Sequence, residues 1–237
     1  PRDVDPTTAM TWDHGTGGHA YNAVQRSAID DDFGHLRSGW AQRGMVIVSR
    51  DQPLYGTRYP LIDQGYSGTL GFYNIGNLPA FRDNQRQAAV DHRVLHRFVR
   101  DVLPGELGVE SFEGIGAFGH SLGSVTTHLG LALQAGDGAD AGLLSGTGGI
   151  FSYYITDTGL LTGGSGTTAA FAQNLFSLLG VSVPDEITGQ NAFAALLGIP
   201  EAAWGGADRM HPVLGLFQTI MDPSDPMAVA PWLNAPE

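Results

Sequence analysis

The sequence contains no cysteine, no lysine and no long hydrophobic run. The lack of cysteine excludes disulfides, thiolate metal sites and a cysteine nucleophile, and it leaves the redox compartment open. All 12 basic residues are arginines, against 24 acidic residues, so the formal net charge is -12. Such a charge repels phosphate backbones and anionic surfaces, which argues against nucleic acid as a partner. A membrane-spanning helix needs about eighteen apolar residues, so no transmembrane segment is predicted.

The 237 residues are enough for one large domain, or for a core with a substantial insertion. The chain begins with Pro1 rather than methionine and reaches its first motif within fifteen residues. We therefore expect it to be a piece of a longer protein.

The motif that organises the chain is Gly119-x-Ser121-x-Gly123. It follows an apolar run at 112–117 and precedes a segment compatible with a helix at 125–134. This order predicts a strand, a sharp turn and a helix, with Ser121 raised at the apex of the turn. Flanking glycines let strand and helix approach closely. Because the chain contains 34 glycines, the spacing could also arise by chance, so its context matters.

A second motif, His14-Gly15-Thr16-Gly17, follows a short strand predicted at 9–12. Glycines in such a loop allow a backbone N–H to point at a developing negative charge, which is the geometry of an oxyanion hole. Taken alone, a glycine-rich loop after a strand is more often an ordinary turn. The two motifs together favour the functional interpretation.

The rest of the first 149 residues alternates between strands and helices. The run 44–49 predicts a parallel central strand buried on both faces. The long loop 51–79 is expected to line a substrate cleft. The apolar period over 81–103 predicts a helix that Pro104-Gly105 ends, and 141–149 predicts a short strand followed by a glycine loop.

Two clusters could suggest metal binding, but a structural role is favoured for both. Asp30, Asp31 and Asp32 lack the spaced ligands and turn glycine of a calcium loop, so they predict a solvated corner. His92 and His96 are four residues apart on the predicted helix, which is a metal-ligand spacing. No partner motif accompanies them, and we expect a solvated or capping role.

The composition changes after residue 149. Residues 150–210 carry two apolar segments joined by looser glycine-rich stretches, which predicts a mainly helical insertion. It could act as a cap over Ser121, or it could be an ordinary helical satellite of the sheet. A short helix is expected at 211–220, and a turn at 222–226 would lead the final section, 211–237, back to the core.

With both motifs in the expected order, the chain resembles the α/β-hydrolase superfamily, of the serine lipase and esterase type. The resemblance covers roughly residues 8–149. It implies an α/β fold with a parallel-sheet core at 1–149 flanked by helices, and a nucleophile, Ser121, that forms an acyl-enzyme. The backbone N–H groups of Thr16 and Leu122 would form the oxyanion hole, with His14, Gly15 and His120 beside the substrate.

The same resemblance implies no metal and no organic cofactor, and a small-molecule or lipid acyl ester as the substrate. It favours a secreted or periplasmic location over a cytoplasmic one. The sequence indicates nothing about acyl chain length or oligomeric state.

The catalytic base and acid depart from the family pattern. Downstream of Ser121 only His128 and His211 remain. His128 lies two turns along the helix that leaves the motif and should not reach the serine. His211 follows Asp208 by three residues, so the two are the candidate base and acid within this chain, but a helix-capping or surface role is favoured for His211. We expect the strands that carry the acid and the histidine to lie beyond Glu237, in a longer protein.

These observations favour a serine carboxylic ester hydrolase. Two alternatives stay open: acyl transfer or peptide hydrolysis by the same nucleophile, and a non-catalytic module that uses its cleft for binding.

Overall fold

The computed structural model describes residues 6–23, 39–59, 68–74, 77–134, 138–151 and 212–234. The predicted cap at 150–210 lies almost entirely outside these ranges. Asp208, His211 and the acidic cluster at 30–32 also lie outside them.

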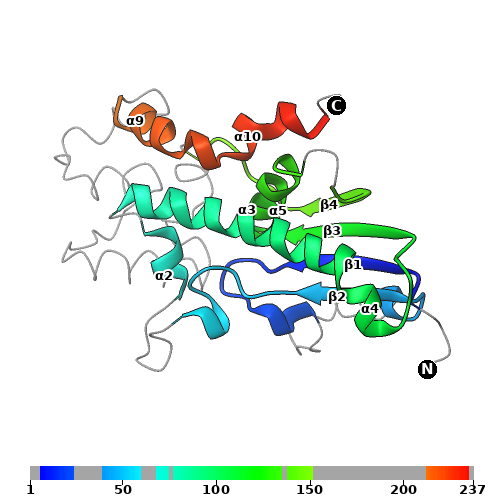
Figure 1. Cartoon of the computed structure of the whole chain (residues 1–237). Coiled ribbons are helices and arrows are strands. Elements are labelled where there is room, and N and C mark those ends of the chain that lie inside the picture. The colour runs from blue at the N-terminus through cyan, green and yellow to red at the C-terminus, as the bar shows by residue number, and fades with distance from the viewer. Residues whose placement is uncertain are drawn as a thin grey trace.

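The described core is one parallel sheet with the strand order β2-β1-β3-β4. Its strands are β1 (Thr8–Asp13), β2 (Met45–Ser49), β3 (Gly114–His120) and β4 (Ala141–Ser145). Every adjacent pair is parallel. With its flanking helices, the sheet confirms the predicted parallel α/β class (Figure 1).

Among the described strands, the second strand does not lie at the centre of the sheet, where the sequence places it. β2 is parallel, as expected, but within the described sheet it lies at an end and pairs with β1 alone. All five of its residues are half-buried. A continuous run of β-branched residues indicates that both faces of a strand are covered by other residues. It does not indicate whether a neighbouring strand pairs with each of its two edges.

Two helices cover one face of the sheet. α3 (Leu78–Asp101) begins with Asn77, whose side chain accepts a hydrogen bond from the N–H of Ala80. α5 (Leu122–Ala132) follows β3 directly and packs against α3 (Figure 1). The predicted stop at Pro104-Gly105 is displaced: α3 ends at Asp101, and Pro104 lies in the first turn of α4 (Leu103–Leu107). Proline is tolerated there because first-turn amides need no intrahelical partner.

Alternate residues of β1 face opposite sides of the sheet. Trp12 stacks on Phe118 with ring centroids 4.1 Å apart, and the edge of Trp40 completes this side. On the other side, Ala9 packs with Val99 of α3 in a second cluster.

His92 and His96 belong to the side of α3 that faces the core, where they are 0% and 1% exposed. The prediction of a solvated or capping role for them is therefore wrong. Polar residues in a helical pattern suggest an exposed face, but here they lie at the crossing of α3 and α5, where Gly130 leaves room for the His92 ring.

The remaining described segments are short helices. Two belong to the loop that was predicted without helical structure: η2 (Gly56–Arg58) and α2 (Gly68–Tyr73). The others are η1 (Ala20–Ala23), α9 (Pro212–Met221), η5 (Asp222–Ser224), α10 (Pro226–Val229) and η6 (Ala230–Asn234). α9 confirms the helix expected at 211–220. None of the helices in the described ranges has both the length and the hydropathy needed to cross a bilayer.

The order in which strands are added reverses between β1 and β3. After β1 the chain continues to β2 on one side of the pair, and after β3 it continues to β4 on the other side. Open α/β sheets bind ligands at the carboxyl ends of the strands at such a point. Asp13 pairs with Gly119, so the loops that carry the two sequence motifs emerge side by side at this point.

Candidate active site

Ser121 occupies the turn between β3 and α5 and has a left-handed backbone, with φ 53° and ψ -119°. A non-glycine residue rarely adopts a positive φ, and such strain is typical of functional sites. The flanking glycines make the turn possible: a Cβ on Gly119 would overlap the backbone of Gly123, and a Cβ on Gly123 would overlap the carbonyl of Asp13. The turn therefore fits against the end of β1.

The loop after β1 lies directly on this turn. A Cβ added to Gly15 would lie 3.3 Å from the carbonyl oxygen of His120 and from the Cβ of Ser121. The N–H of Gly18 donates to the carbonyl of Gly15 at 3.0 Å, which folds residues 15–18 into a turn. Thr16 is exposed, and its hydroxyl lies 2.6 Å from the hydroxyl of Tyr73. The predicted oxyanion residue is thus tied to α2.

His14 lies in the core and holds this loop by a hydrogen bond to its backbone. Its ring is buried, and its Nε2 accepts a hydrogen bond from the backbone N–H of Gln52 at 3.2 Å. Nδ1 must then carry the proton that it donates to the carbonyl of Gly15 at 2.8 Å. Burial lowers the pKa of His14, outweighing the hydrogen bond to Gly15 and the nearby carboxylates, so the ring is held neutral. His14 shapes the loop from within the core.

A buried ionic cluster lies under the same end of β1. Oδ2 of Asp13 accepts hydrogen bonds from Nδ1 of His92 at 2.8 Å and from the hydroxyl of Thr127 at 2.9 Å, while Oδ1 lies 3.2 Å from Arg50. Burial alone would raise the pKa of Asp13, but Arg50 and His92, with the hydrogen bonds, hold that pKa at about 2. The charged carboxylate joins β1 to α3 and α5.

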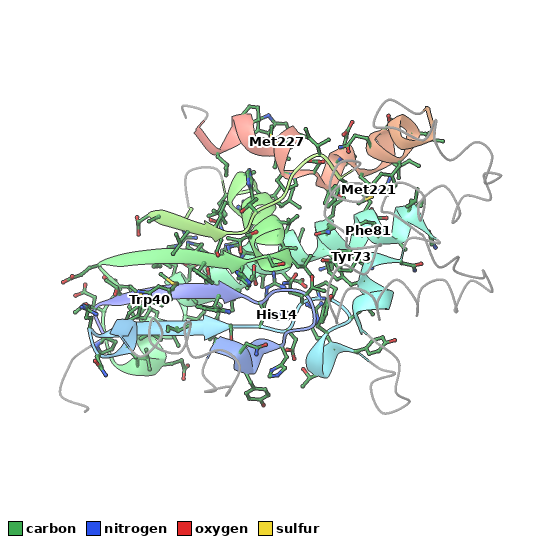
Figure 2. The ribbon with its side chains drawn as sticks, turned by 180° about the vertical axis from the view of Figure 1, so that it is seen from behind. His14, Trp40, Tyr73, Phe81, Met221 and Met227 are labelled. Carbon is green, nitrogen blue, oxygen red and sulfur yellow. The ribbon has the colours of Figure 1, made fainter. Side chains whose placement is uncertain are left out.

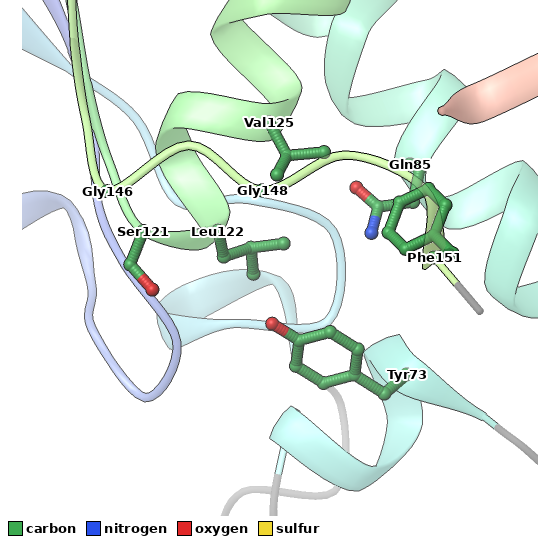
Figure 3. Close-up of a pocket in the computed structure, with 8 residues that line it drawn as sticks. All are labelled: Tyr73, Gln85, Ser121, Leu122, Val125, Gly146, Gly148 and Phe151. Carbon is green, nitrogen blue, oxygen red and sulfur yellow. The ribbon is translucent and has the colours of Figure 1, made fainter. Parts of the chain in front are cut away.

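Ser121 lines a narrow pocket (Figure 3). Its described lining is largely apolar, with a volume of about 10 Å³, which is the space of about one water molecule. The hydroxyls of Ser121 and Tyr73 point toward one another at one side of this space (Figure 3). The lining residues are Tyr73, Gln85, Ser121, Leu122, Val125, Gly146, Gly148 and Phe151.

Aromatic contacts extend from the loop to the far wall of the pocket. Tyr73 packs on Phe81 with ring centroids 5.4 Å apart, and Phe81 packs on Phe151 at 5.7 Å. At the other end, His14 contacts Tyr55 at 5.2 Å. Figure 2 shows His14, Tyr73 and Phe81 grouped beyond the carboxyl end of β1, away from Trp40. Buried aromatic pairs of this kind make the wall rigid.

The remaining candidate residues are distributed as follows. Leu122 is the first residue of α5, where helix geometry leaves amides without intrahelical partners. His120 places Nδ1 3.2 Å from the hydroxyl of Ser145 on β4. Neither His14, Gly15 nor His120 is among the described residues that line the pocket. Across the described ranges, acidic and histidine side chains form no group of three that could hold a metal ion.

His128 lies farther along α5 and is half-buried. Burial lowers its pKa, and the charge of Asp225 opposes that shift. Asp225 itself is buried and accepts hydrogen bonds from the N–H groups of Ile150 and Phe151, at 3.0 and 2.8 Å. It thus joins the start of α10 to the loop after β4.

Sequence reasoning missed Tyr73, Gln85 and Phe151, which line the pocket. The long loop was expected to line a cleft, but nothing in the sequence selects Tyr73 among its tyrosines. Gln85 lies within a helix whose surroundings are set by tertiary packing, so no local pattern marks it.

Comparisons with known proteins complete the description of the site. No family model matches the sequence, and no curated protein matches it. Among solved structures, the chain is similar to a highly thermostable carboxyl esterase from Bacillus coagulans, crystallised in complex with glycerol. The two share 16% sequence identity and a TM-score of 0.44, over 98% of this chain and 78% of the esterase chain.

Proposed function

We propose that this chain is a serine carboxylic ester hydrolase with Ser121 as its nucleophile. The observation that carries the proposal is the strained conformation of Ser121, at the apex of the turn between β3 and α5 and in contact with the loop after β1. A fold alone does not imply a reaction, but this placement exposes a hydroxyl beside backbone amides at a helix N-terminus.

In the proposed reaction, Oγ of Ser121 attacks the carbonyl carbon of an ester while its proton passes to a base. The carbonyl oxygen becomes an oxyanion, held by the N–H groups of Leu122 and Thr16; each such donor contributes about 10²–10³ in rate. The tetrahedral intermediate collapses, the C–O bond to the alcohol breaks, and the alcohol leaves with the proton. Water then attacks the acyl-enzyme and releases the acid.

The base in this proposal is His211, oriented by Asp208. Both residues lie outside the described ranges. Two described histidines are less suited to the role. The Nδ1 atom of His120 is engaged with Ser145, and Nε2 of His14 accepts a hydrogen bond from Gln52 within the core. A base must lie within hydrogen-bond reach of the serine hydroxyl.

The proposed substrate is a small-molecule or lipid acyl ester. The described lining is largely apolar, with Leu122, Val125 and Phe151 near Ser121, which favours a neutral ester over a charged substrate. Tyr73 lines the same pocket, with its hydroxyl toward Ser121 (Figure 3), and it can position an ester group there.

Labelling with a fluorophosphonate tests the proposal. This reagent forms a covalent adduct with an activated serine, and intact mass with peptide mapping would locate the adduct. We expect one adduct per chain, on Ser121, and none in Ser121→Ala. Ser145→Ala changes the neighbouring serine at the end of β4 and should keep the adduct. A folded chain that takes no label would contradict the proposal and favour a non-catalytic binding module.

A further inference from the structure

Gln85 places a buried amide in the wall of the pocket. Gln85 is 0% exposed, and among the described residues neither its Oε1 nor its Nε2 has a hydrogen-bond partner. Buried amides are nearly always paired, so an exception calls for a physical reason. In Figure 3 the Gln85 amide is turned into the pocket, between Val125 and Phe151 and across from Ser121.

We propose that Gln85 is a specificity-determining residue that recognises a hydroxyl group on the chain of an ester bound at Ser121, with the hydroxyl entering this pocket. The inference rests on the function proposed for Ser121. An amide offers both donors and acceptors, and a hydroxyl is the smallest substituent that can use both kinds. Its single O–H donates to Oε1 while its oxygen accepts from Nε2.

The pocket argues against other polar groups. Of the described residues that line it, none is charged, so a carboxylate or an ammonium group would be buried without a counter-ion. Its volume of about 10 Å³ has room for about one water molecule, so the chain of the ester would lie outside it and only the hydroxyl would enter. Val125 and Phe151 flank the amide, and a matching hydroxyl supplies it with a partner (Figure 3).

This arrangement produces discrimination because an ester without the hydroxyl leaves the amide unpaired. Sites that are built to hydrogen-bond a substrate reject analogues that lack the partner more strongly than apolar pockets reject an extra methylene. The hydroxyl can belong to the acyl chain or to the alcohol, and the test separates these two sources.

The test uses two pairs of esters of equal shape. Ethyl 3-hydroxybutyrate and ethyl 3-methylbutyrate differ by a hydroxyl against a methyl group in the acyl chain. The esters 2-hydroxyethyl butyrate and propyl butyrate differ in the same way in the alcohol. Ligand-observed NMR would give Kd for all four on Ser121→Ala, where no turnover occurs, and kcat/KM would be measured on the unchanged chain.

We expect the hydroxyl-bearing member of one pair to bind about tenfold more tightly or better. Gln85→Met, which keeps the length and removes the amide, should abolish that preference while leaving the methyl-bearing ester bound. Gln87→Met is the matched control: it makes the same change two residues away, on an exposed side chain paired with Asp91, and it should keep the preference.

Thermal stability distinguishes this role from a purely structural one, because replacing a structural glutamine would lower Tm. Because none of the described residues pairs with its amide, Gln85→Met should raise Tm by roughly 2–6 °C. Equal Kd values within both pairs, or a preference that survives Gln85→Met, would overturn the inference. Fluorophosphonate labelling distinguishes this failure from that of the proposed function, since Ser121 would still take the label if only the role of Gln85 were wrong.

Discussion

Two polar groups lie buried on the same side of α3, two helical turns apart, and their surroundings differ. His92 meets Asp13, whose carboxylate also contacts Arg50 and Thr127. Gln85 lines the pocket of Ser121, and its amide has no hydrogen-bond partner among the described residues. A buried polar group with partners joins elements of the fold, whereas one without partners is available to a ligand. The carboxyl end of β1 is thus held by a paired cluster, and the pocket beside it retains an unused hydrogen-bonding group.

The largest loss of stability should come from removing the charge of Asp13 in the paired cluster. Asp13→Asn removes the carboxylate charge that faces Arg50 in a fully buried position. Leaving one charge of a buried pair without its partner costs about 3–5 kcal/mol, which chemical denaturation would measure. Asp83→Asn is the control, because Asp83 forms its ion pairs with Arg82 and Arg86 at the surface. A loss of stability no greater than that of the control would contradict the supporting role of Asp13.

Acid should weaken the same cluster in a defined range. The pKa of Asp13 is about 2 in the folded chain, below its ordinary value of 3.8. The unfolded chain therefore takes up a proton at higher pH than the folded chain does. The stabilisation is present above pH 4 and is lost as the pH falls toward 2. The shift corresponds to about 2 kcal/mol.

Unfolding free energies measured between pH 2 and pH 5 would test this dependence. The dependence assigned to Asp13 should disappear in Asp13→Asn. An unchanged acid profile in that variant would mean that other groups produce the loss.

A smaller effect is expected where α3 crosses α5. A Cβ on Gly130 would lie 2.6 Å from Cδ2 of His92, so Gly130→Ala must displace the ring that holds Asp13. Overpacking costs about 1–3 kcal/mol, partly offset by the higher helix propensity of alanine. Gly215→Ala, in α9, meets no atom within 4 Å and should not destabilise the chain. Equal thermal stability of the two variants would show that the crossing has room to spare.

The parts of the molecule that could be predicted are those whose structure depends on residues close together in the sequence. The glycines around Ser121 and in the loop after β1 indicate close backbone approach whatever the rest of the chain does, and both motifs lie where their order implied. The apolar period of α3 predicted that helix to within three residues at each end. The parallel class followed from the alternation of strands and helices.

What could not be predicted depends on tertiary contacts. The neighbours of β2 are decided by strand order, which no local run of residues encodes. His92 and His96 read as surface residues because their burial depends on α5, some thirty residues later. The unpaired state of Gln85 likewise depends on Phe151 and α5, so the sequence offers no sign of it.

A rapid quench with an activated ester tests the proposed nucleophile most directly. The chain would be mixed with p-nitrophenyl acetate, stopped with acid within the first turnover and examined by intact mass and peptide mapping. We predict one added acetyl group on Ser121, absent in Ser121→Ala and present in Ser145→Ala. A folded chain that releases p-nitrophenol with the acetyl group on another residue, or that releases none, would contradict the assignment of Ser121.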